Sequence, residues 1–117
     1  MAEKGLSIAH RIVNTLEEKK GESIVLLDIS EHCSFTDYFI ICNAISERTM
    51  KALSNEVQME VKKEFSLNAW GVEGKPEGGW ILIDYGDVVV HLFSAEQRSY
   101  YQLEELWNEG TVLLHIR

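Results

Sequence analysis

The sequence predicts an α/β fold, in which a single mixed β-sheet carries helices packed mainly on one of its faces. The segment 80–93 has two apolar runs on either side of Gly86-Asp87, a pattern that is typical of a β-hairpin. Two longer segments repeat apolar residues at helical spacing, and two short apolar runs have the length of buried strands. Helices and strands that alternate in this way are best accommodated by one sheet with a helical layer.

Each element has a local signal at its boundaries. The first helix ends at Gly21, and Ser46 is a typical N-cap for the second helix. Ser94 with Gln97 three residues later forms a capping-box pattern that predicts a last helix, which Gly110 ends. In chain order the predicted elements are a helix over 5–20, strands over 24–29 and 38–42, a helix after 46 that reaches 65, a strand over 69–73, a loop over 74–79, hairpin strands over 80–85 and 88–93, a helix to 107, and a tail over 111–117 with some strand character.

The hairpin sequence also predicts which side chains share a face. If Gly86-Asp87 is a two-residue turn, Trp80 lies opposite Phe93 and alternate residues point to opposite faces. One face then carries only aliphatic residues, and we expect it to pack against the helices: Ile81, Ile83, Val88, Val90 and Leu92. The other face mixes aromatic, apolar and polar residues: Trp80, Leu82, Asp84, Val89, His91 and Phe93. We expect the helices to leave this second face bare, and its composition suits a surface that binds a protein partner.

Composition and charge limit the classes of partner. A chain of 117 residues predicts one domain over 1–117. Its net charge of −8 disfavours direct binding to nucleic acid or to anionic membranes and favours a basic protein surface. No secretory signal or membrane-length apolar run is visible, so a cytoplasmic location is expected. Cys33 and Cys42 are not spaced as a metal clamp, and we expect them to be reduced.

The sequence provides no convincing catalytic, cofactor or metal site. The hairpin turn separates Asp84 from Asp87, so these carboxylates cannot share one strand face as a two-metal site requires. No glycine-rich phosphate loop precedes a helix. The adjacent pair His32-Cys33 is a weak nucleophile–base signal, because neighbouring side chains rarely point at one atom. The four histidines show no metal-ligand spacing. No enzymatic activity is therefore predicted.

An ordered set of motifs covers most of the chain. They are Asp28-Ile29-Ser30, Thr36 to Ile41, Ser46-Glu47-Arg48, Glu73-Gly74, Gly79-Trp80, Asp84 to His91, and Arg98 to Trp107. This set resembles the ribosomal silencing factor (Iojap) family from about residue 6 to residue 109. The resemblance implies a nucleotidyltransferase-like fold without the catalytic carboxylates of the transferases. It also implies binding to the large ribosomal subunit through its fourteenth protein, blocked subunit joining and translational repression during nutrient shortage, with a part in subunit maturation as a further role.

On this interpretation the second face of the hairpin is the partner-binding site. We expect the apolar anchor to consist of Trp80, Leu82, Val89 and Phe93. Asp84 and His91 are expected to orient the partner, and Asp84, Glu73 and Glu77 to meet its lysines or arginines. The same face could instead be covered by the C-terminal tail or by a second copy of the chain in a homodimer. Two other functions remain open, a degenerate nucleotidyltransferase-fold enzyme and a homodimeric adaptor in ribosome biogenesis.

Overall fold

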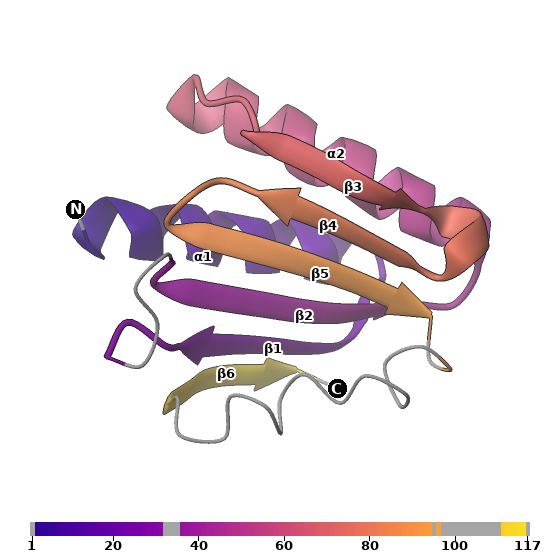
Figure 1. Cartoon of the computed structure of the whole chain (residues 1–117), viewed down its shortest axis with the longest axis horizontal. Helices are drawn as coiled ribbons and strands as arrows, with labels where there is room; N and C mark the ends of the chain where they lie inside the picture. The colour runs from indigo at the N-terminus through magenta and orange to yellow at the C-terminus, as the bar shows by residue number, and fades with distance from the viewer. Residues whose placement is uncertain (1, 32–35, 95, 97–110, 117) are drawn as a thin grey trace.

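The computed structural model describes residues 2–31, 36–94, 96 and 111–116 of the chain. These residues form a six-stranded sheet with the strand order β3-β4-β5-β2-β1-β6 (Figure 1). The elements are α1 (Ala2–Glu18), β1 (Glu22–Asp28), β2 (Tyr38–Ala44), α2 (Glu47–Phe65), β3 (Gly71–Lys75), the 3-10 turn η1 (Pro76–Gly78), β4 (Trp80–Asp84), β5 (Val88–Ser94) and β6 (Thr111–Ile116). Strands β2 and β5 are parallel, and the other neighbouring pairs are antiparallel. The predicted single mixed sheet is confirmed.

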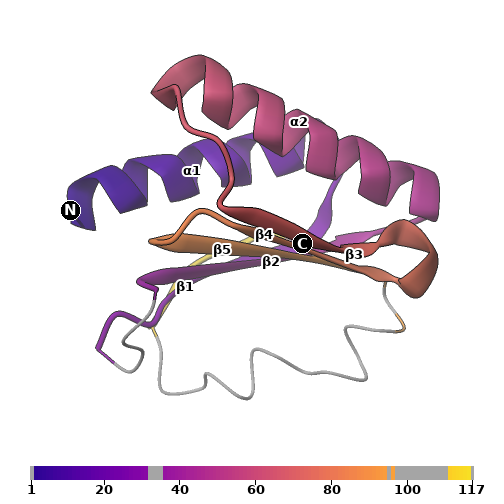
Figure 2. The same cartoon turned by 45° about the horizontal axis from the view of Figure 1, so that its top comes forward.

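Helices α1 and α2 lie against the same face of the sheet, which we call the helix face (Figure 2). The core between the layers is aliphatic, and its largest fully buried side chains include Ile12 and Leu16 of α1, Leu53 of α2 and Ile83 of β4. The aliphatic set predicted for the hairpin belongs to this core without exception. Burial of apolar surface at roughly 25 cal/mol per Å² makes this layer the main source of stability.

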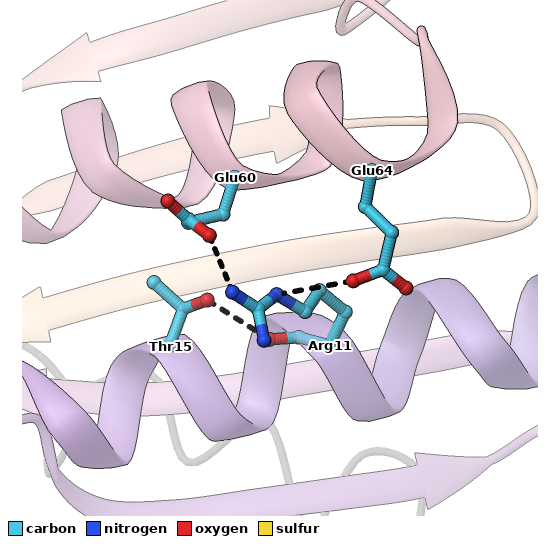
Figure 3. Close-up of polar contacts among 4 residues, drawn as sticks. All are labelled: Arg11, Thr15, Glu60 and Glu64. Carbon is cyan, nitrogen blue, oxygen red and sulfur yellow. Dashed lines mark hydrogen bonds and ion pairs between the residues drawn. The ribbon is translucent and has the colours of Figure 1, made fainter.

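An ion pair joins the two helices above that core (Figure 3). The guanidinium of Arg11 on α1 donates a hydrogen bond to Glu60 on α2, and its Nε lies 3.4 Å from Oε1 of Glu64. This hydrogen bond from Arg11 lowers the pKa of Glu60. Thr15 Oγ1 donates to the carbonyl oxygen of Arg11 at 3.0 Å, one turn along α1. These contacts link the partly exposed sides of α1 and α2.

The start of α2 follows its predicted cap. Ser46 has an extended backbone, and its side-chain oxygen accepts a hydrogen bond from the backbone N–H of Thr49 at 3.0 Å. This contact satisfies one of the backbone donors that a helix N-terminus leaves without a partner. The helix ends at Phe65, and its C-cap Ser66 takes the left-handed conformation.

The hairpin has the predicted register. Trp80 pairs with Phe93, and the ladder continues to the pair of Asp84 with Val89. In the turn, the Tyr85 N–H donates to the Val88 carbonyl at 2.8 Å, and Gly86 has a φ of 86°. A side chain at this φ would be strained, so the glycine makes the turn possible.

Several boundaries differ from the prediction. Strand β1 runs over Glu22–Asp28 rather than 24–29, and β2 extends to Ala44 rather than to residue 42. Strand β3 begins and ends two residues later than expected, because Gly74 lies within the ladder at a φ of 89° beside the backbone of Trp80. The C-terminal tail is a full edge strand, β6, that pairs with β1. The first helix begins at Ala2 rather than at residue 5. The predicted last helix falls almost entirely on 97–110, outside the described residues.

Candidate functional site

The second face of the sheet is apolar and buried, not bare. Strand alternation places the predicted partner-binding residues of β4 and β5 on it together, as expected. However, Val89 is only 6% exposed, His91 5% and Phe93 0%. The expectation that the helices leave this face bare is therefore wrong at these three residues, while their binding to a partner stays a prediction. Val89 and Phe93 belong to a second cluster, and the ring of His91 contacts Phe39 and Phe93 of that cluster. The other members of the cluster are Val25, Leu27, Ile29, Phe39 and Ile41.

Strand order adds apolar side chains to this face. Strand β2 pairs in parallel with β5, so Phe39 lies beside Val89 and Ile41 lies beside His91 on the second face. A hairpin considered alone lacks these neighbours. Leaving so many large apolar side chains in water would be costly, at roughly 2 kcal/mol for each large side chain.

Exposure on this face increases toward the β3 edge. Trp80 and Leu82 on β4 are partly buried, Asp84 is also of intermediate exposure, and Glu73 on β3 is exposed. Glu73 pairs with Leu82 across the ladder, which places both on the second face. We call these four residues the docking strip. It is the part of the predicted site that another protein can reach in this structure.

A group of aromatic rings includes Trp80 of the docking strip. The rings of Trp80 and Phe93 are parallel within 6° with centroids 6.1 Å apart, and the rings of His91 and Phe93 are parallel within 4° at 5.9 Å. Trp80 and His91 are also parallel, within 3° at 6.2 Å. Phe39 meets His91 edge-on at 5.0 Å and 73°. Such offset and edge-on arrangements are the favourable ones for aromatic rings.

His91 also forms a hydrogen bond with Trp80 within this group of rings. The indole Nε1–H of Trp80 donates to Nδ1 of His91 at 3.3 Å. Because Nδ1 accepts, the proton of the neutral imidazole must lie on Nε2. Nε2 is buried and has no hydrogen-bond partner within the described part of the chain. Burial lowers the pKa of His91 from 6.5 to about 4, so the ring is neutral near pH 7.

The carboxylates near the hairpin are used in turns. Asp84 Oδ1 accepts from the Gly86 N–H at 2.7 Å, and Asp28 accepts from the Ser30 N–H and hydroxyl at 3.0 and 2.7 Å. Asp84 lies on the second face. Asp28 pairs with Tyr38 of the helix-face core, so the two carboxylates are on opposite faces of the sheet. Asp87 is exposed in the hairpin turn. Among the residues described, no group of three His, Cys, Asp or Glu is placed to hold a metal ion.

A cavity of about 660 Å³ lies between α2 and η1. Of the predicted partner-binding residues, only the weaker candidate Glu77 lines it. No helix in the described ranges has the length and apolar character needed to span a membrane.

Trp70 is an exposed aromatic residue that the sequence patterns did not single out. Trp70 is 77% exposed, and its backbone N–H donates to the Asp84 carbonyl at 2.7 Å. Its ring lies over Gly86, where a Cβ would come within 2.8 Å of the indole. Val72, two residues later, is 46% exposed at the same edge. The signal was available, because an isolated tryptophan before an edge strand has few neighbours that can bury it.

Comparisons with known proteins agree with the motifs. The family model described as "Ribosomal silencing factor during starvation" matches residues 2–115. A ribosomal silencing factor RsfS of Halalkalibacterium halodurans is 38% identical over 98 residues, which is 84% of this chain and 83% of that protein. A crystal structure of a Chromobacterium violaceum protein aligns with a TM-score of 0.83 at 38% identity, covering 88% of this chain and 85% of that chain. A Mus musculus protein named "Mitochondrial assembly of ribosomal large subunit protein 1" is 31% identical over 101 residues, 82% of this chain and 43% of that protein.

Proposed function

Because this chain belongs to the ribosomal silencing factor family, we propose that it represses translation by binding the large ribosomal subunit and blocking the small subunit from joining it. The names of its relatives support the ribosomal part of this proposal, since one includes "silencing factor" and another includes assembly of the "ribosomal large subunit". The net charge of −8 supports docking on a basic ribosomal protein rather than on ribosomal RNA. We propose the fourteenth protein of the large subunit as this partner, in the cytoplasm.

The proposed docking mode rests on the composition and the exposure of the docking strip. Trp80 and Leu82 supply a partly buried apolar centre, Glu73 lies opposite Leu82 on β3, and Asp84 lies further along β4 on the same face. An aromatic anchor surrounded by charge is the usual composition of an interface hot spot. Val89 and Phe93 support this strip from the next strand as part of the second cluster. The protein then acts by occupying a surface, with no catalytic step.

Co-sedimentation with purified large subunits tests the docking strip. Trp80→Ala should weaken binding about thirtyfold, since truncating a central interface tryptophan commonly costs 2 kcal/mol or more. Asp84→Asn should weaken it less, because an amide oxygen can still accept from Gly86 N–H while the charge is lost. Met59→Ala is the matched control, as Met59 is 54% exposed on α2, away from the second face. Wild-type binding by both strip variants would refute this docking mode.

The two alternatives predict different measurements. Thermal stabilisation by a nucleoside triphosphate with magnesium would favour the enzyme, because a ligand that binds the native state raises its stability. A homodimeric adaptor would remain dimeric when it binds the subunit, as measured by sedimentation. If the docking strip instead mediates both contacts, dimers should form at high concentration and dissociate when the ribosomal protein is added.

A further inference from the structure

His91 cannot contact a docking partner directly in this conformation, because only 5% of its surface is exposed. It nevertheless touches the residue at the centre of the docking strip. Its Nδ1 accepts the indole N–H of Trp80 at 3.3 Å, while Phe93 stacks on both rings. The question is what this buried contact does for an anchor that is itself partly exposed.

Ring stacking alone does not define the orientation of the indole. The Phe93 ring is parallel to Trp80 within 6°, and a half-turn of the indole about its χ2 axis would leave the two planes parallel. Torsions of this kind are broad and roughly two-fold in their preference. The hydrogen bond distinguishes the two orientations, because only one of them directs Nε1–H at the imidazole. The edge of the indole opposite Nε1 then points away from the imidazole.

We infer that His91 is a positioning residue for docking: it holds the Trp80 indole in one orientation before the partner arrives. An anchor that is ordered in advance loses less conformational entropy on binding. This inference rests on the proposed function of the docking strip. It replaces the expected direct contact of His91 with an action through Trp80.

Two substitutions separate the hydrogen bond from the packing of the ring. His91→Phe keeps an aromatic ring beside Phe93 and Phe39 but has no acceptor. His91→Asn loses the ring but retains an amide oxygen that can reach the position of Nδ1. If His91 positions the indole, His91→Phe should weaken binding to large subunits about twofold, because the fraction of the protein with the indole in the binding orientation falls from nearly all to about half. His91→Asn should then bind more tightly than His91→Phe. The reverse order would overturn the inference, since it would mean that only packing matters.

A measurement on the free protein makes the test independent of the ribosome. The chain has three tryptophans, and the indole N–H resonance that disappears in Trp80→Phe belongs to Trp80. In His91→Phe this resonance should move upfield and broaden, while the Trp70 indole signal stays in place. An unchanged Trp80 resonance would refute the positioning role. If the wild-type chain failed to bind large subunits, the proposed function would fall, and this resonance would still decide the role of His91.

A double-mutant comparison covers the case in which His91→Asn does not fold. In a Trp80→Phe background there is no indole N–H to hold, so His91→Phe should cause no further loss of binding. An equal loss in both backgrounds would show that His91 acts without Trp80, and would overturn the inference. His91→Phe itself removes a buried donor that lacks a partner in the described residues, which offsets the acceptor that Trp80 loses, so this variant should fold.

Discussion

At the scale of single residues, His91 should make stability depend on pH. Its pKa is lowered by burial from 6.5 to about 4, so below pH 6.5 the unfolded chain binds a proton that the folded chain does not. Above pH 6.5 His91 is neutral in both states and does not change the free energy of unfolding with pH. As the pH falls from 6.5 toward 4, protonation of the unfolded chain lowers the free energy of unfolding. At pH 5 the loss should reach roughly 2 kcal/mol relative to pH 8, as obtained from the two pKa values.

Urea unfolding of wild type and His91→Phe at pH 8 and pH 5 measures this contribution. Carboxylates titrate in both proteins, so only the difference between the two pH dependences reports on His91. The variant should lose about 2 kcal/mol less stability than the wild type on acidification. His10→Gln serves as a control, because His10 is exposed on α1. Identical pH dependences in wild type and His91→Phe would contradict the burial of a neutral imidazole.

At the scale of elements, strand β3 depends on Gly74. A Cβ at this position would lie 2.2 Å from the Trp80 carbonyl oxygen, and the φ of 89° is itself unfavourable for a side chain. Gly74→Ala should therefore cost at least about 2 kcal/mol of stability, since the clash is with backbone rather than with a flexible side chain. It should also weaken binding to large subunits, because the shift falls on Trp80.

Gly78→Ala is the matched control for Gly74→Ala. A Cβ at Gly78 would meet no atom within 4 Å, and the residue does not have a positive φ. Its substitution should change stability by no more than about 0.5 kcal/mol, or raise it slightly by restricting the unfolded chain. Thermal melts of both variants provide the comparison. Equal melting temperatures would mean that β3 does not approach Trp80 as the structure has it.

At the scale of the whole molecule, size is sufficient to explain silencing. The principal extents are 34 × 32 × 24 Å, so a bound copy rises at least about 24 Å in any orientation. Contacts between ribosomal subunits require approach to about 3 Å. A copy bound near such a contact must therefore hold the subunits apart. No conformational change or chemical step is needed.

Sucrose gradients test this steric mechanism. Separated subunits mixed with one equivalent of protein per large subunit should stay separate, whereas ribosomes that are already joined should remain joined, because the site is then covered. Trp80→Ala at the same concentration should allow joining. Complete inhibition by much less than one equivalent would indicate a catalytic modification and would refute the steric mechanism.

Local signals in the sequence determined most of the elements. Helical spacing and the Ser46 cap predicted α2, and the Gly86 turn predicted the hairpin, its register and the two faces. These features depend on residues close together in the chain, where periodicity and turn geometry act directly. The family motifs were also present in the sequence, so the proposed ribosomal function did not require the structure.

Only the tertiary structure decided which of the shared-face residues a partner can reach. The parallel pairing of β2 with β5 joins segments about fifty residues apart and brings Phe39 and Ile41 against the second face. Likewise, the pairing of β6 with β1 converts the C-terminal tail into an edge strand. Period-two alternation assigns a side chain to a face but carries no information about what lies beside that face. Burial depends on neighbours that are distant in sequence, and this is why the sequence did not reveal that Val89, His91 and Phe93 are buried.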